Sequence, residues 1–124
     1  MLQITATTPD ERELCPIRNV LASLSGKWQP LILFALEDAP LRFSAIRRAI
    51  GDVTQRVLTE NLRNLERDGY LTRHVDPGPP VAVEYRLTPM GLSLCAVLRP
   101  YVEWASDSYP AVRAARAAYD ARTG

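Results

Sequence analysis

The sequence predicts a mainly α domain with one small β-hairpin, an α+β fold class, on the basis of three patterns. Leu58, Leu62 and Leu65 recur at steps of four and three, which is the spacing of an amphipathic helix over residues 53–70. Residues 70–75 and 81–87 then form two extended runs around a loop rich in proline. A long helical pattern opens at Thr88 and extends through most of the remaining chain.

Size and composition are those of one globular domain. The chain has 124 residues, of which 47% are hydrophobic and 23% charged. It has no run of about 18 apolar residues, so we expect no membrane span. The N-terminus lacks a basic start followed by an apolar run, and we therefore expect no secretory signal and a cytoplasmic location.

Charge is unevenly distributed along the chain. The net charge is only +1, but residues 42–74 carry a net +3, and every cation in that segment is arginine. Residues 1–41 carry a net −2, and the remainder is neutral. The excess is modest, and it permits a polyanionic partner without requiring one.

Before the hairpin, the patterns predict an arm followed by four helices. Residues 1–13 have no periodicity. The first helix is expected to begin near Cys15-Pro16 and to end at Ser25-Gly26, and the second to occupy residues 29–36. A short strand at residues 41–43 should precede a third helix capped by Ser44. Gly51-Asp52 forms the turn into the fourth helix, at residues 53–70.

That fourth helix carries the candidate function. Thr54 is placed to cap its start, and Gly69 to end it in the left-handed conformation. Two short helices joined by a tight turn indicate a helix-turn-helix, and a helix with Thr, Gln and Arg in its first turn suits the DNA major groove. The alternative is an ordinary solvated face. The candidate DNA contacts are Arg42, Thr54, Gln55, Arg56, Thr59, Arg63, Arg73 and His74.

The hairpin and the C-terminal segment complete a winged helix-turn-helix. A hairpin directly after such a helix is a wing, with residues 76–80 as its turn. Thr88-Pro89 should open a helix that Pro100 kinks or splits, and residues 111–121 should form a last helix after Pro110. We divide the single domain into an arm (1–14), a winged-helix core (15–87) and C-terminal dimerisation helices (88–124). Aromatic residues there could instead pack within one subunit.

Four segments in order are similar to the HxlR-type winged helix-turn-helix transcriptional regulators, bacterial and archaeal relatives of the MarR group. The resemblance covers residues 15–104. The segments are Cys15-Pro16 with Gly26-Lys27-Trp28; Leu58-Thr59, Leu62, Leu65-Glu66 and Asp68-Gly69 with Arg73; Pro79-Pro80; and Val83-Glu84-Tyr85, Leu87-Thr88 and Gly91.

The resemblance implies a homodimeric regulator on a pseudo-palindromic, double-stranded operator, with N- and C-terminal helices at the interface and the two wings flanking the DNA. By position, Thr54, Gln55, Arg56 and Thr59 match the groove-facing residues, with Arg63 nearer the backbone. Members commonly carry a basic residue after the wing prolines, whereas Val81 follows Pro80 here. Arg73 and His74, at the base of the wing, are the expected replacements.

Two cysteines bear on how such a regulator is controlled. Cys15 stands where relatives that sense electrophiles or oxidants carry a reactive thiol, and a helix N-terminus lowers a thiol pKa. A small buried structural cysteine is the alternative. Cys95 lies on the apolar stripe of the long helix and is expected in the core. The two could form an inter-subunit disulfide only if their Cα atoms approach within about 7 Å.

Other function classes have less support. His74, Cys15 and Cys95 lack metal-ligand spacing, and no catalytic set can be assembled around the single histidine, so we expect no enzyme, metal or cofactor. A switch without thiol chemistry would hold a small aromatic inducer near Trp28, Tyr101 and Trp104. A third possibility is a protein-interaction module that uses the winged fold without DNA.

Overall fold

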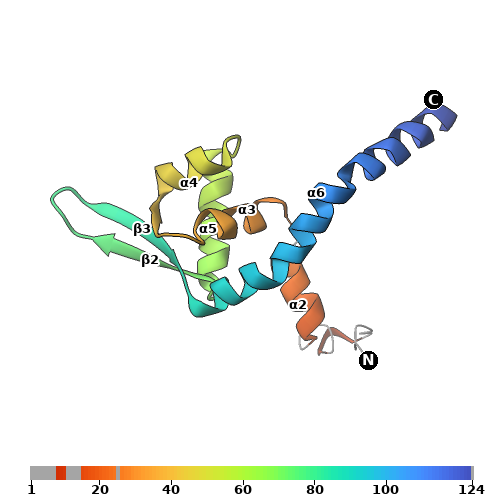
Figure 1. Ribbon diagram of the computed structural model, residues 1–124. Coiled ribbons are helices and arrows are strands. Elements are labelled where there is room, and N and C mark those ends of the chain that lie inside the picture. Colours follow the sequence, from red (N-terminus) through yellow and green to blue (C-terminus); the bar gives the residue numbers. More distant parts are fainter. Residues whose placement is uncertain (1–7, 11–14, 25, 124) are drawn as a thin grey trace.

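The computed structural model describes residues 8–10, 15–24 and 26–123. The predicted fold class is confirmed, since the chain is mostly helical with one small three-stranded antiparallel sheet (Figure 1). The predicted arm falls largely outside these residues. The elements are α2 (Pro16–Ser23), α3 (Trp28–Ala35), β1 (Leu41–Arg42), α4 (Phe43–Ile50), α5 (Gln55–Arg67), β2 (Leu71–Asp76), β3 (Ala82–Leu87) and α6 (Pro89–Thr123).

One apolar core joins the helices to the sheet. Helix α5 buries Leu58, Leu62 and Leu65, the three leucines of the predicted stripe. They pack with Ile32 and Leu33 of α3, and further core residues come from α4, β2 and α6. Because these positions are almost fully buried, loss of contact with water stabilises the arrangement of α5 against α3.

Both ends of α5 are closed by local chemistry, as predicted. The Thr54 hydroxyl accepts a hydrogen bond from the backbone N–H of Val57 at 3.2 Å. At the other end Gly69 has a φ of 84°, and the N–H of Tyr70 donates to the carbonyl of Leu65. This six-to-one bond is characteristic of a Schellman ending. The helix direction is therefore set at both termini.

The helix α4 begins differently from the prediction. Its N-cap residue is Arg42 and its first residue is Phe43, so the expectations of a strand through residue 43 and a cap at Ser44 were wrong. Phe43 packs against the core as part of the helix. The need to bury this ring outweighs the local preference of serine for the cap position.

The sheet has the strand order β1-β3-β2 and forms the predicted wing. Antiparallel pairing sets Arg73 opposite Tyr85 and His74 opposite Glu84, and β1 sets Arg42 opposite Glu84. Paired residues share a face and neighbours along a strand alternate. Arg73 and Tyr85 therefore lie on one face of the sheet, and Arg42, His74 and Glu84 lie on the other.

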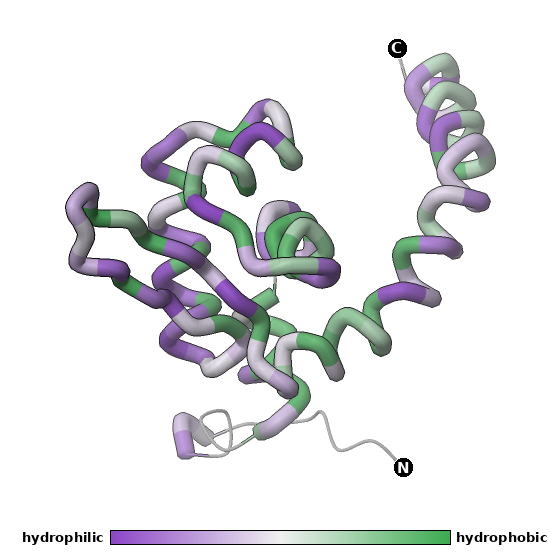
Figure 2. The backbone as a smooth tube through the Cα atoms, turned by 60° about the vertical axis from the view of Figure 1, so that its left-hand side comes forward, coloured by the Kyte–Doolittle hydropathy of each residue, from purple (hydrophilic) through white to green (hydrophobic). Residues whose placement is uncertain are grey.

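Helix α6 continues from Pro89 to Thr123, with Pro100 and Pro110 inside it, so the separate helix predicted for residues 111–121 was wrong. It follows a curved path away from the wing (Figure 2). A proline lacks one N–H donor and pushes on the preceding turn, which bends a helix without necessarily ending it. The first turns pack against α3 and β3, whereas the distal half carries mostly exposed side chains.

Thr88 anchors the start of α6 to the end of α5. Its hydroxyl accepts from the N–H of Gly91 at 3.1 Å, which confirms the predicted cap, and donates to the carbonyl of Gly69 at 2.6 Å. Its N–H donates to the carbonyl of Tyr70. No helix in the described part of the chain is both long and apolar enough to cross a bilayer.

Candidate nucleic-acid interface

The side of α5 that faces away from the core is polar and exposed. Gln55, Arg56, Thr59, Glu60 and Arg63 line one shallow pocket along this side. They repeat at intervals of three and four, so they occupy adjacent positions on the helix surface. We call these five residues, together with Arg73 of β2, the recognition surface.

Two of these side chains are held by the helix itself. Arg56 donates from Nε to Oε1 of Glu60 at 3.2 Å, one turn further along the helix. The Thr59 hydroxyl donates to the carbonyl of Gln55 at 2.8 Å, and its oxygen retains lone pairs that can accept. Thr54, by contrast, already uses its hydroxyl oxygen as the helix cap.

The wing brings a second element to this surface. Arg73 and Tyr85, which are register partners, line a pocket with Thr59, Arg63 and Glu66 of α5. Two arginines, one from the helix and one from the strand, thus share one concave site. Guanidinium groups arranged in this way suit a phosphate group of a DNA strand.

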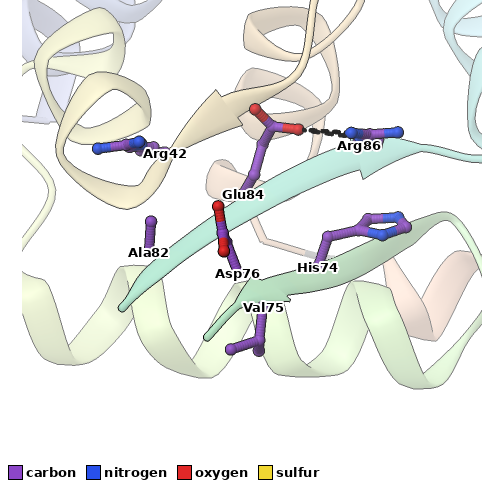
Figure 3. Close-up of a pocket in the computed structure, with 7 residues that line it drawn as sticks. All are labelled: Arg42, His74, Val75, Asp76, Ala82, Glu84 and Arg86. Carbon is purple, nitrogen blue, oxygen red and sulfur yellow. Dashed lines mark hydrogen bonds and ion pairs between the residues drawn. The ribbon is translucent and has the colours of Figure 1, made fainter. Parts of the chain in front are cut away.

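The structure separates two of the predicted contacts from the others. Arg42 and His74 line a different pocket with Asp76, Glu84 and Arg86, on the face of the sheet opposite Arg73 (Figure 3). There Arg86 donates from Nε to Oε1 of Glu84 at 2.9 Å, and the His74 ring lies 2.9 Å from the Thr72 hydroxyl. Figure 3 shows Val75 pointing away from this group. Carboxylates and cations alternate in this pocket, which makes it less suited to a polyanion than the recognition surface.

The turn that precedes α5 is fixed by a side chain. Arg47 of α4 donates from Nε to the carbonyl of Val53 at 3.1 Å, and Gly51 ends α4 with a φ of 103°. Val53 itself is buried in the core. The helix α4, the turn and α5 therefore form a rigid helix-turn-helix unit that holds the recognition surface outward.

The cysteines and aromatic residues lie elsewhere. Cys15 is the N-cap residue of α2 and is largely buried, Cys95 is fully buried in the core, and neither of these two residues is in a disulfide. Burial raises the pKa of the Cys95 thiol, and the Glu37 carboxylate adds to that rise while Arg99 opposes it. Trp28 packs against the core, whereas Tyr101 and Trp104 are exposed on α6.

Tyr85 and Glu66 line the pocket without having been predicted from the sequence, and Glu60 was not among the candidate contacts. The predicted hairpin could have placed Tyr85 on the same face as Arg73, because counting outward from the turn at residues 76–80 pairs Arg73 with Val83, and Tyr85 lies two residues further along that strand. The observed register pairs Arg73 with Tyr85 itself. Glu60 and Glu66 are acidic, and a polyanionic partner favours cationic and neutral polar contacts instead. Within the described residues, no group of three His, Cys, Asp or Glu side chains could hold a metal ion.

Comparisons with known proteins agree with this architecture. Residues 23–112 match the family model described as HxlR-like helix-turn-helix. An HTH-type transcriptional regulator from Methanothermobacter thermautotrophicus is 43% identical over 95 residues, which cover 77% of this chain and 72% of that protein.

Solved structures of similar proteins extend the match to three dimensions. The transcriptional regulator YtfH from Salmonella typhimurium has a TM-score of 0.74 and 40% identity, covering 84% of this chain and 93% of its own. The redox regulator HypR in its oxidised form has a TM-score of 0.69 and 36% identity, covering 75% of this chain and 96% of its own.

Proposed function

Because this chain belongs to the HxlR-like helix-turn-helix family, whose members are DNA-binding transcriptional regulators and not enzymes, we propose that it binds operator DNA as a homodimer through the recognition surface. Each subunit would place α5 in the major groove of one half-site of a pseudo-palindrome. Half-sites would lie about one helical turn apart. A DNA-binding regulator acts where the genome is, so we propose a cytoplasmic location.

The observation that carries this proposal is the juxtaposition of Arg63 and Arg73. The two side chains come from different elements and line one pocket beside the groove-facing residues of α5. A phosphate held there would fix the register of α5 against the bases. Gln55, Arg56 and Thr59 would then contact base edges, with Thr54 at the start of the helix.

Salt-dependent DNA binding tests this assignment. Arg63→Ala and Arg73→Ala should each weaken binding to all duplexes and lower the dependence of log K on log salt by about one. Arg56→Ala should instead relax sequence preference. Arg86→Ala, on the other face of the wing, is the matched control and should change neither quantity. Unchanged binding of the Arg56 and Arg63 variants would overturn the placement of α5.

The same experiment tests the remaining candidate contacts. Arg42 and His74 lie on the opposite sheet face from Arg73, so Arg42→Ala and His74→Ala should affect affinity less than Arg73→Ala. If they weaken binding as strongly, the DNA reaches around the wing to its outer face. If the parent protein binds neither random duplexes nor the DNA upstream of its own gene, this result would favour the alternative of a protein-interaction module.

We further propose that Cys15 senses an oxidant or electrophile. Its thiol lies at the N-terminus of α2, and the similar protein HypR is named a redox regulator. The thiol oxidant diamide should release the parent protein from DNA but leave Cys15→Ser bound. Equal release of both proteins would remove the thiol mechanism. A small aromatic inducer near Trp28, Tyr101 and Trp104 would then be the leading alternative, because two of these rings are exposed on α6.

A further inference from the structure

We propose that Glu60 determines sequence specificity, by accepting a hydrogen bond from the N4 amino group of a cytosine in the major groove while it orients Arg56 toward a neighbouring guanine. The proposal rests on the DNA-binding function proposed above. It adds to that function a base preference and a residue that reads it.

The geometry places Glu60 within the recognition surface. Its side chain is 56% exposed, and it lines the same shallow pocket as Gln55, Arg56, Thr59 and Arg63. Arg56 and Glu60 are separated by about 6 Å along the helix axis, since each residue rises about 1.5 Å. That distance is close to two base-pair steps of about 3.4 Å each, so the pair can contact two base pairs that lie within two steps of each other at the same time.

The charge of Glu60 limits what it can contact. A carboxylate is repelled by DNA phosphates, so on a helix that faces DNA it is tolerated best over the bases, where amino groups can donate to it. The partner Arg56, with a side chain 88% exposed, offsets part of the repulsion. An acid at this position weakens non-specific binding and thereby favours the sequence that supplies a donor.

The ion pair also orients Arg56. The bond joins Nε to Oε1, so it does not itself use the two terminal amino groups of the guanidinium. A guanidinium fixed at one edge can present its remaining donors to guanine O6 and N7. Glu60 is in this respect a positioning residue for Arg56 as well as a direct reader.

The base patterns give a definite preference. Cytosine offers the N4 amino donor in the major groove, whereas guanine and thymine offer only acceptors there, which a carboxylate rejects. Adenine also offers an amino donor at N6, but its N7 acceptor lies beside that donor and repels a carboxylate. Glutamine, which both donates and accepts, pairs best with adenine N6 and N7. Glu60→Gln should therefore exchange a cytosine preference for an adenine preference at one position of each half-site.

The test is selection of duplexes from a randomised double-stranded library by the full-length parent, Glu60→Gln and Glu66→Gln. Glu66 lies on the same helix, is exposed and has the same charge, but it sits beside Arg73, so its variant is the matched control. We expect the parent to favour cytosine at one position, with discrimination of roughly 5- to 100-fold. Glu60→Gln should lose this preference, and its preference for guanine at a neighbouring position should become weaker. Glu66→Gln should bind all duplexes more tightly with an unchanged preference.

The outcomes separate this inference from the function on which it rests. If the parent selects a sequence and Glu60→Gln selects the same one, Glu60 is only a solvated charge and this inference fails alone. If the parent selects no sequence, both proposals fail. Circular dichroism of both variants verifies folding, and the exposure of both residues makes intact folding the expected result.

Discussion

Gly91 occupies the first turn of α6, where that helix passes over the backbone of Tyr70. A Cβ atom at this position would lie 2.1 Å from the Tyr70 carbonyl oxygen, which is too close for any side chain. The same carbonyl accepts a hydrogen bond from the N–H of Thr88. Absence of a side chain is therefore what allows α6 to begin directly against the end of α5.

Gly91→Ala should destabilise the fold by about 1–3 kcal/mol, because the added methyl group forces the two backbones apart. The free energy of unfolding in urea measures the effect. Ser93→Ala, at an exposed position of the same helix, should change stability little and serves as the control. Equal stability of the two variants would show that α6 does not approach Tyr70 in this way.

The buried thiol of Cys95 makes the free energy of unfolding vary with pH in the alkaline range. Burial raises its pKa above the ordinary value of 9.0, since the fold disfavours the thiolate. The protonated thiol contributes to the free energy of unfolding, and this contribution is fully present below the pKa that the thiol has in the unfolded chain. It is lost as the pH rises through the pKa that the thiol has in the folded protein. Between about pH 8 and 10, stability should fall less steeply in Cys95→Ala than in the parent. Urea unfolding at several pH values provides this comparison, and parallel curves would contradict it.

At the scale of the element, α5 is the part of the chain whose form follows most directly from local chemistry. Its leucine spacing, the Thr54 cap and the left-handed Gly69 were all predictable, because each depends on residues within one or two turns. Helix α4 shows the opposite case. The serine that locally favours a cap lies inside the helix, because burial of Phe43 against the core places the helix start earlier.

Removal of the Thr54 hydroxyl should loosen the start of α5. Thr54→Ala is expected to cost about 1 kcal/mol of stability, because the N–H of Val57 loses its acceptor. Thr54→Ser keeps the oxygen and should retain most of that stability. Thermal unfolding in the absence of DNA measures both variants without interference from any DNA contact. A serine variant as unstable as the alanine variant would mean that the methyl group matters and the cap does not.

At the scale of the whole molecule, the part of α6 beyond residue 100 carries mostly exposed side chains among the described residues. Tyr101, Trp104 and Tyr109 are exposed by 69%, 62% and 52%. Large exposed aromatic residues on an extended helix favour association, because burial removes their apolar surface from water. We therefore expect α6 to pack against a second copy of the chain.

Trp104→Glu should shift the protein from dimer to monomer, since a carboxylate would then be buried at the interface without a partner. Sedimentation velocity measures the change. Val81→Glu makes a similar apolar-to-acid substitution at another exposed position, in the loop that precedes β3, and should leave the oligomeric state unchanged. If the parent is monomeric, the homodimer proposal fails, and with it the pairing of two recognition helices on one operator.

Patterns within one or two turns were sufficient to predict the helix-turn-helix, the wing, the caps of α5 and α6 and the polar face of α5, because capping and periodicity are short-range effects. Tertiary contacts decided three further features. Strand register placed Arg73 beside α5 and put Arg42 and His74 on the opposite face. Core burial moved the start of α4. Helix α6 continued through two prolines, because a missing hydrogen bond bends a helix without dictating where it ends.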